Sequence, residues 1–306
     1  MGAGGVGGYF GARLAKGGAD VTFIARGAHL AAMRQGGLSI EGPEPMRIAP
    51  VNVTDDPATV APVELVMLAV KLWDTEAALE RIRPLVGSGT TVISFQNGVL
   101  KDDVLRRAFD PARIMGGVAY VSAAIERPGV IRQTGTNQRL LFGEFDGGRS
   151  ARGAAFLQAC ESGGINAELS PDIRRETWQK YVFLVAVSGA TATMRTPVGP
   201  IRQNPQTRAF LLDVMREVVA VGRAHGVALA GREAEDRLAY VDSLPSDVTS
   251  SMHRDLERGN RLEVPWLSGG VVELGKEAGV PTPLNRAIAD ILAPHAEGTR
   301  PRPIPT

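Results

Sequence analysis

Met1-Gly2-Ala3-Gly4-Gly5-Val6-Gly7-Gly8-Tyr9-Phe10-Gly11-Ala12 is the stretch that decides the fold of this chain. Gly2, Gly4 and Gly7 have the spacing G-x-G-x-x-G and run into a segment with a helical pattern. In this motif the first glycine permits a tight turn, the second lets the backbone approach a pyrophosphate, and the third lets the helix pack on a sheet. The helix would run from about Val6 to Lys16, and Gly5 and Val6 would lie at its start, where free N–H groups and the helix dipole attract phosphate. The stretch predicts a dinucleotide-binding turn; the alternative is a purely structural glycine-rich turn.

Arg26 indicates which dinucleotide would bind. The apolar segment 19–25 is typical of a buried strand, and Arg26 ends it about 20 residues after the glycine motif, where an NAD site would carry an acid. A guanidinium instead suits the 2′-phosphate of NADP, because it offers several donors and a permanent positive charge. We therefore expect NADPH as the cofactor. The alternative is that Arg26 is a solvated residue at a strand end.

The start of the chain lacks one expected feature. A βαβ unit needs a strand before its glycine turn, yet Met1 stands directly against Gly2. We therefore expect that the first strand of the sheet is truncated and that the native product begins upstream with an apolar strand. Otherwise the sheet has an unfilled slot between its second and fourth strands. An intact mass that matches a start at Met1 would contradict an upstream strand.

The composition narrows the class of protein. A chain of 306 residues is long enough for two domains, and a net charge of +1 with 22% charged residues gives no field that favours nucleic acid or an anionic membrane. Apolar segments such as 181–190 are too short to span a bilayer. The single cysteine, Cys160, rules out an internal disulfide and suits a reducing cytoplasm. The four scattered histidines predict no structural metal site.

The order of elements predicts an α/β fold followed by an all-helical domain. Strand patterns at 63–70, 91–95 and 114–122 alternate with helical ones, which is typical of a Rossmann-type parallel sheet. Short strands at 38–40 and 47–53 would form a hairpin, and a pair of strands would lie around 129–143. We expect an NADP-binding domain at 1–166, a helical substrate and dimerisation domain at 167–296, and a flexible tail at 297–306. The predicted helices of the second domain are 172–194, 204–226, 232–241, 250–258 and 264–279.

Two polar residues follow strands of the predicted sheet. Lys71 ends the strand 63–70 and Asn97 follows the strand 91–95, so both would lie at the carboxyl edge of the sheet, where ligands bind. Lys71 could assist Arg26 on the 2′-phosphate or contact the substrate; the alternative is a solvated strand cap. Asn97 could orient a carbonyl or carboxylate beside the nicotinamide; the alternative is an ordinary Asn-Gly turn.

Lys180 is a candidate proton donor. Hydride transfer to a ketone leaves an alkoxide that must be protonated, and Lys180 introduces the apolar run 181–187, where desolvation would make an ammonium a better acid. The alternative is that Lys180 extends to solvent and pairs with Glu176 four residues earlier. The residues alone leave both interpretations open.

Several separate motifs together resemble the ketopantoate reductase family, the 2-dehydropantoate 2-reductases. The motifs, in chain order, are the glycine stretch 2–8, Arg26-Gly27-Ala28-His29-Leu30, Gln96-Asn97-Gly98, Glu176-Thr177-Trp178-Gln179-Lys180, Ser250-Ser251-Met252 with Asp255, and Glu263. The resemblance runs from Gly2 to about residue 283. It implies an NADPH-binding Rossmann domain, a helical second domain and an active site between them.

The resemblance also implies roles for individual residues. Lys180 matches the general acid of the family, and Glu263 matches a glutamate that supports the substrate and proton transfer. Ser251 matches a serine that binds the substrate carboxylate, and Asn97 matches the asparagine after the fifth strand. The alternatives are a helix-start acid for Glu263 and a helix N-cap hydroxyl for Ser251.

The chain departs from the family beyond the lysine. Lys180, Leu184 and Ser188 share one helical face. Well-studied members carry asparagines at the positions of Leu184 and Ser188, and a further asparagine can stand at the position of Val198. Loss of amides removes partners for a substrate hydroxyl, and an apolar site discriminates less strongly for a hydroxyl. Leu184 and Ser188 would still line the substrate site, but the substrate could be a related 2-keto acid.

The sequence thus predicts an NADPH-dependent reductase of a branched 2-keto acid, most simply ketopantoate, acting on a small molecule as a cytoplasmic protein and possible homodimer. A second hypothesis is another hydroxy-acid or opine dehydrogenase of the same architecture. A third, of a different class, is a non-catalytic NADPH-binding regulator; the presence of both Lys180 and Glu263 argues against it.

Overall fold

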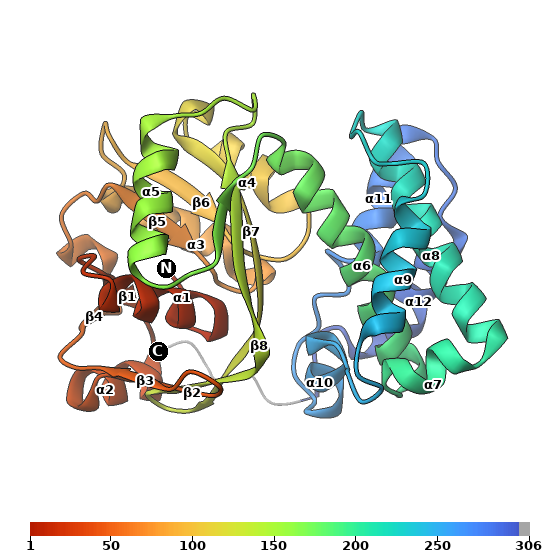
Figure 1. The fold of residues 1–306 in the computed structure, drawn as a ribbon, viewed down its shortest axis with the longest axis horizontal. Helices are drawn as coiled ribbons and strands as arrows, with labels where there is room; N and C mark the ends of the chain where they lie inside the picture. The colour runs from red at the N-terminus through yellow and green to blue at the C-terminus, as the bar shows by residue number, and fades with distance from the viewer. Residues whose placement is uncertain (300–306) are drawn as a thin grey trace. The chain divides into compact units, whose positions relative to one another are not determined.

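The computed structural model describes residues 1–299, which form two compact units (Figure 1). Unit 1 comprises Met1–Asn97 and Lys101–Glu176, and unit 2 comprises residues 98–100 and 177–299. Unit 1 contains all the strands, and unit 2 is helical. The predicted fold class, a parallel α/β sheet followed by a helical domain, is confirmed.

The strands of unit 1 form two sheets. The larger has seven strands in the order β3-β2-β8-β7-β6-β5, with β9 beside β8, and the smaller is the parallel pair β1–β4. Strands β5, β6 and β7 run parallel, whereas β7 and β8 form a long antiparallel ribbon. The strand bounds are β1 Thr22–Ile24, β2 Leu38–Glu41, β3 Met46–Ile48, β4 Asn52–Thr54, β5 Leu65–Leu68, β6 Thr91–Ser94, β7 Ile114–Arg127, β8 Val130–Gly143 and β9 Ala167–Leu169.

Helices cover both faces of the larger sheet at β5 and β6, because these strands are apolar on both sides. Val66 and Leu68 of β5 join Val92 of β6 in a core with α3 and α4. The alternate residues, including Met67 and Ile93, join a second core with α1, α2 and α5. The helices of unit 1 are α1 Gly5–Lys16, α2 Gly27–Gly36, α3 Thr75–Ile82, α4 Leu100–Ala108, which begins in unit 2, and α5 Ala151–Ser162, with short 3-10 turns η1 Pro57–Thr59, η2 Leu72–Asp74, η3 Arg83–Leu85 and η4 Pro111–Arg113.

The first residues link the two sheets. The Met1 amine donates to the Met67 carbonyl of β5 at 2.7 Å. The amides of Gly2 and Ala3 both donate to the carbonyl of Ile24 at the end of β1, at 3.2 and 3.1 Å. Burial lowers the pKa of the Met1 amine to about 5. The glycine turn therefore lies between the ends of β1 and β5; the expected upstream strand stays a prediction.

Three details of unit 1 differ from the sequence expectations. The segment predicted as one strand at 47–53 is two strands, because Pro50 has no N–H to continue a ladder, and β4 pairs with β1. The region 129–143 holds a single strand, since Gly129, at φ +76°, forms the turn and β8 then pairs continuously along β7 apart from two register shifts. The division between the units follows Glu176 rather than residue 166, because β9 pairs with β8 and belongs to the sheet.

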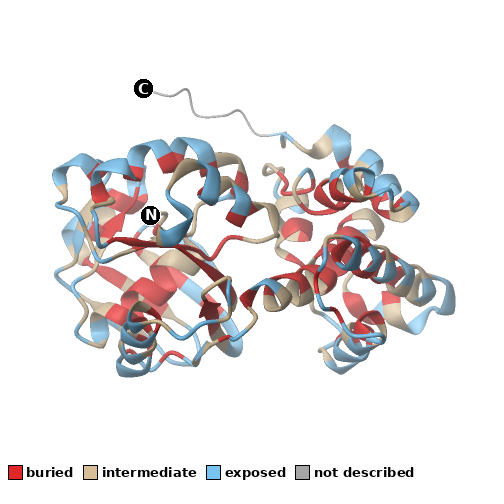
Figure 2. Cartoon of the chain, turned by 90° about the horizontal axis from the view of Figure 1, so that it is seen from above, coloured by how far each residue is buried: buried red, intermediate tan, exposed pale blue. Residues whose placement is uncertain are grey.

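Unit 2 packs its helices around one apolar core. Figure 2 shows buried and exposed residues interspersed within single helices, as expected for helices with one inward face. The helices are α6 Ile173–Met194, which begins in unit 1, α7 Val198–Gln203, α8 Pro205–Ala224, α9 Glu233–Ser243, α10 Ser251–Glu257, α11 Ser268–Ala278 and α12 Pro283–Leu292, followed by the 3-10 turn η5 Ala293–His295.

The predicted helix 264–279 begins later than expected. The amides of Trp266 and Leu267 both donate to the carbonyl of Glu263, which makes residues 263–267 a turn, and α11 begins at Ser268. Of the predicted tail, residues 300–306 lie outside the described residues, whereas the Thr299 amide donates to the Gly259 carbonyl at 3.0 Å.

Three general properties bear on function. Across residues 1–299, the helices are all too short or too polar to cross a membrane. The same part of the chain contains no group of three or more His, Cys, Asp or Glu side chains that could hold a metal ion. Cys160 is buried and unpaired by any disulfide, and burial raises the pKa of its thiol to about 12.

Candidate active site

The glycine turn has a shape that only glycine permits at three positions. Gly2 has φ +90°, and a Cβ on it would lie 2.8 Å from the amide nitrogen of Val70. A Cβ on Gly7 would overlap the carbonyl of Gly2, and one on Gly5 would overlap the carbonyl of Ala123 in β7. Side chains at these positions would push α1 away from the turn and from the sheet. The helix start is thus held close to the carboxyl ends of the strands.

Gly4 differs from its neighbours because a Cβ there would meet nothing within 4 Å. It is the N-cap of α1 and supplies no side-chain cap. The amides of the first helical turn, including Gly5 and Val6, have no intrahelical acceptors. This combination of space, free donors and helix dipole fits the pyrophosphate of a dinucleotide.

Arg26 and Lys71 lie in the two loops that flank the glycine turn. Arg26 follows β1 as the N-cap of α2, and its Nη2 lies 3.0 Å from Oδ2 of Asp74 in η2. Lys71 follows β5, and its Nζ lies 5.5 Å from the ring centroid of Trp73. Arg26 thus stands at the carboxyl end of a strand of the smaller sheet and Lys71 at the carboxyl end of a strand of the larger one. Asp74, the partner of Arg26, was not singled out by the sequence.

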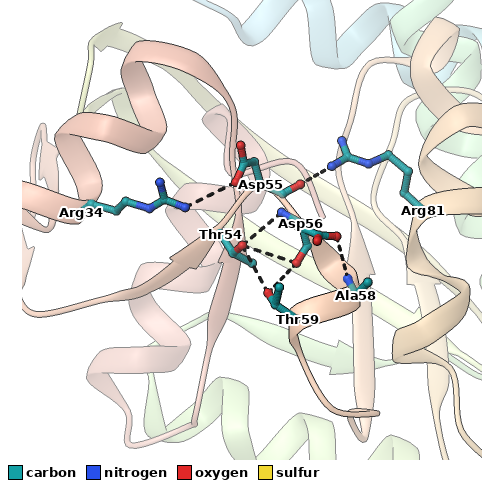
Figure 3. A network of polar contacts seen from close by, with 7 residues as sticks. All are labelled: Arg34, Thr54, Asp55, Asp56, Ala58, Thr59 and Arg81. Atoms are coloured by element: carbon teal, nitrogen blue, oxygen red, sulfur yellow. Dashed lines mark hydrogen bonds and ion pairs between the residues drawn. The ribbon is translucent and has the colours of Figure 1, made fainter.

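A second ionic cluster holds the loop after β4 (Figure 3). Arg34 of α2 donates to the Asp55 carboxylate at 3.3 Å, and Arg81 of α3 donates to the Asp55 backbone carbonyl. The next residue, Asp56, caps η1 by accepting from the Ala58 amide at 3.0 Å. The cluster ties the β1–β4 pair to α3, which packs against β5, and so fixes the edge on which Arg26 stands.

Gln96 fixes the loop that carries Lys71. Its Nε2 donates to the Val70 carbonyl at 3.0 Å and to Thr75 Oγ1 at 2.8 Å, and its Oε1 accepts from Ser94 Oγ at 2.9 Å. Gln96 is buried, so these bonds are shielded from water. Half-buried Asn97 follows directly. Sequence reasoning selected Asn97 and missed the supporting role of Gln96, because a buried amide at a strand end has no distinctive pattern.

In unit 2, Lys180 stands on α6 between two anchored neighbours. Gln179 Nε2 donates to Glu233 of α9 at 3.0 Å. Tyr181 Oη donates to the carbonyls of Leu267 and Trp266 at 2.7 and 2.9 Å. Successive residues of an α-helix point about 100° apart, so these contacts set the direction of Lys180 between α9 and the turn 263–267. These neighbours thus set the direction in which the side chain of half-buried Lys180 leaves the helix.

Glu263 begins the turn that Tyr181 holds. Its side chain is buried, and its carbonyl accepts from two amides of the turn. Burial raises the pKa of Tyr181, so its hydroxyl keeps its proton and remains a donor. The elements that carry Lys180 and Glu263 are therefore joined by hydrogen bonds. Because α11 begins only at Ser268, the alternative of Glu263 as a helix-start acid is wrong.

Ser251 is the first residue of α10, and a different serine caps this helix. Ser250 Oγ accepts from the His253 amide at 2.9 Å, so the N-cap alternative for Ser251 is wrong. Ser250 Oγ also lies 2.9 Å from Thr191 Oγ1 of α6. The helix that carries Lys180 therefore also fixes the start of α10 and the half-buried Ser251.

The departures from the family pattern lie along the same helix. Leu184 is half-buried and Ser188 is fully buried, and the Ser188 hydroxyl makes no hydrogen bond with another residue in the range 1–299. Val198 is buried as the first residue of α7. The side chains of leucine and valine form no hydrogen bonds, and the hydroxyl of a serine offers fewer donors and acceptors than the side-chain amide of an asparagine.

The glycine turn of unit 1 has the form that binds a dinucleotide, and in unit 2 a lysine and a buried glutamate stand on joined elements; oxidoreductases that use a pyridine nucleotide carry features of both kinds. Comparison with known proteins agrees. The profile of the family described as "Ketopantoate reductase PanE/ApbA" matches residues 1–147, and that of its C-terminal domain matches residues 172–296. The chain therefore belongs to the ketopantoate reductase family.

Individual relatives cover nearly the whole chain. The Bacillus subtilis protein described as "Uncharacterized oxidoreductase YkpB" is 30% identical over 93% of both chains. A 2-dehydropantoate 2-reductase of Mesorhizobium japonicum is 32% identical over 94% of both chains. The crystal structure of 2-dehydropantoate 2-reductase from Geobacter metallireducens superposes with a TM-score of 0.90 at 28% identity, covering 96% of this chain and 98% of that one.

Proposed function

We propose that this chain reduces 2-dehydropantoate to pantoate with NADPH, a step of pantothenate and coenzyme A biosynthesis. The observation that carries the proposal is the placement of Lys180, held between the Gln179 and Tyr181 contacts on the helix bonded to the Glu263 turn. Relatives described as 2-dehydropantoate 2-reductases support the substrate.

Each residue would have one task in this reaction. Bound NADPH supplies the hydride that forms the new C–H bond at the carbonyl carbon. The Lys180 ammonium donates a proton to the carbonyl oxygen, which becomes the hydroxyl of the product, and solvent restores the proton. Ser251 donates a hydrogen bond to the substrate carboxylate. Glu263 and Asn97 orient the reacting groups.

The choice of NADPH rests on Arg26 and Lys71, with the glycine turn holding the pyrophosphate. Direct binding measurements with NADPH and NADH test it. NADPH should bind more tightly to the unmodified protein, and equal affinities would contradict the choice. The predictions of a homodimer and of a cytoplasmic location are untested and stay predictions.

Lys180→Ala tests the chemistry. The variant should bind NADPH as the unmodified protein does and lose about 10²- to 10⁴-fold in kcat with 2-dehydropantoate, as expected for a lost general acid. The measurement is the loss of NADPH absorbance, with binding followed by calorimetry. Lys276→Ala, which removes an exposed lysine from α11, is the matched control and should be fully active. An active Lys180→Ala enzyme would refute the mechanism.

A second candidate substrate follows from Leu184 and Ser188. The buried Ser188 and the apolar Leu184 provide fewer partners for the substrate hydroxyl than amides would. A related branched 2-keto acid without the hydroxymethyl group would then be used about equally well. The test compares kcat/KM for 2-dehydropantoate and 2-ketoisovalerate. A strong preference for 2-dehydropantoate would remove this alternative, and no turnover of either would favour a non-catalytic role.

A further inference from the structure

The ion pair between Arg26 and Asp74 spans the glycine turn. Arg26 follows β1 and Asp74 ends η2 after β5. The Gly2 amide donates to the Ile24 carbonyl at the end of β1, and Gly2 lies so close to the Val70 backbone that a Cβ would not fit. The pair thus lies where the loops on either side of a dinucleotide-binding turn meet. In such folds the ribose farthest from the nicotinamide is recognised at the end of the strand that Arg26 follows.

Asp74 occupies a donor that a phosphate would need. The Arg26 side chain is 71% exposed, and its Nη2 is held 3.0 Å from the Asp74 carboxylate. A 2′-phosphate that binds Arg26 must share this guanidinium with a second anion, and the two anions repel. A ribose 2′-hydroxyl brings no charge, so the same carboxylate does not repel it and can accept its hydrogen bond.

We propose that Asp74 is a specificity-determining residue that weakens the preference for NADPH over NADH by holding the guanidinium of Arg26. This role of Asp74 rests on the proposed function only in that the dinucleotide binds at the glycine turn. It changes the ratio of the affinities for NADPH and NADH and does not depend on which keto acid is reduced.

Other cations on α2, α3 and the loop after β5 have partners of their own. Arg34 and Arg81 both donate to Asp55 in the cluster of Figure 3, the first to its carboxylate and the second to its backbone carbonyl. Lys71 lies over the Trp73 ring. Arg26 is the cation that directly follows β1, so the state of the Arg26–Asp74 pair alters the charge offered to a 2′-phosphate there.

The test measures binding of two small probes by calorimetry. The probe 2′,5′-ADP carries the 2′-phosphate and 5′-ADP lacks it, so the ratio of their affinities reports that phosphate alone. Asp74→Asn should tighten 2′,5′-ADP about three- to tenfold, as expected for removing one nearby, partly screened like charge, and leave 5′-ADP nearly unchanged. Asp290→Asn, which breaks another exposed aspartate–arginine pair on α12, is the matched control and should change neither.

A double variant shows whether Asp74 acts through Arg26. Arg26→Ala should lower affinity for 2′,5′-ADP, and adding Asp74→Asn to it should give little of the gain seen with Asp74→Asn alone. An unchanged or lowered affinity ratio in Asp74→Asn, or a full gain that persists without Arg26, would overturn the proposal.

The outcome is separable from that of the proposed function. If the unmodified protein binds both probes equally, the choice of NADPH fails. The inference about Asp74 would still be supported if Asp74→Asn, and not Asp290→Asn, raised the affinity for 2′,5′-ADP relative to 5′-ADP. If the unmodified protein prefers 2′,5′-ADP and Asp74→Asn leaves that preference unchanged, the inference fails and the choice of NADPH stands.

Discussion

Tyr181→Phe removes one oxygen atom that joins the helix of Lys180 to the turn of Glu263. The Tyr181 hydroxyl is buried and donates to the carbonyls of Leu267 and Trp266 at 2.7 and 2.9 Å. A phenylalanine ring fits the same space, since the substitution adds no atom. The change therefore isolates the hydrogen bonds.

The size of the effect follows from these contacts. A net hydrogen bond stabilises a protein by about 0.5–1.5 kcal/mol, and an acceptor left buried without a partner costs more. The Leu267 carbonyl retains a bond from the Val271 amide at 3.0 Å, so it loses only part of its hydrogen bonding. We expect a fall of about 1–2 kcal/mol in unfolding free energy and, for a chain of this length, roughly 2–3 °C in Tm.

Activity should fall together with stability. A turn that is no longer held lets Glu263 shift relative to Lys180, and misplacement of reacting groups by about 1 Å can cost 10²-fold in rate. We expect kcat/KM to fall about tenfold while NADPH affinity is unchanged. Urea unfolding and the NADPH absorbance assay measure the two effects.

Tyr240→Phe is the matched control because it removes the same atom from an exposed side chain on α9. It should leave Tm and activity unchanged. If Tyr181→Phe were as stable and as active as Tyr240→Phe, the hydrogen bonds would not hold the turn and the reasoning would be refuted.

Two further predictions concern unit 1. In Gly7→Ala the new Cβ overlaps the Gly2 carbonyl, so we expect about 1–3 kcal/mol of destabilisation in urea unfolding and weaker NADPH binding by calorimetry. Gly89→Ala is the control, because its Cβ meets nothing within 4 Å, and it should change neither stability nor binding. Equal stability of the two variants would contradict the packing argument. In Glu144→Gln the bidentate bond to Arg152, at 2.7 and 2.6 Å, is weakened. Since Arg152 holds the pKa of Glu144 below its usual value, the bond's stabilisation is present above about pH 4.5 and is lost as pH falls through the lowered pKa. Urea unfolding should thus show a variant less stable by about 1 kcal/mol at pH 7, with the gap closing in acid, and a constant gap would count against the pair.

The sequence predicted the layers of the fold well because the relevant signals are local. Alternating apolar runs such as 63–70 and 91–95 indicated buried parallel strands, and the helical periodicity of 172–194 corresponds to α6. The glycine spacing at residues 2–7 indicated a turn that only small residues permit, and the structure shows the overlaps that a Cβ would cause. These features depend on residues within a few positions of one another.

The sequence predicted less well where partners had to be chosen. The segment 47–53 has the pattern of a single strand, yet β4 pairs with β1 across the chain. The division between the units could not be placed at 176, because only the pairing of β9 with β8 assigns residues 167–169 to the sheet. Strand pairing depends on register and packing over the whole sheet, which a local pattern does not contain.

By itself, then, the sequence determined the glycine turn, the alternation of strands and helices, and the identity of Lys180 and Glu263 as candidates. Only the tertiary structure decided which distant residues contact one another and so position the elements that carry the candidate site residues. Three hydrogen bonds join residues that are far apart in the sequence: Arg26 and Asp74 are separated by 48 positions, Thr191 and Ser250 by 59, and Tyr181 and Leu267 by 86. Such pairs arise when packed elements bring distant segments within about 3 Å of each other, and no periodicity of the chain encodes which segments those will be.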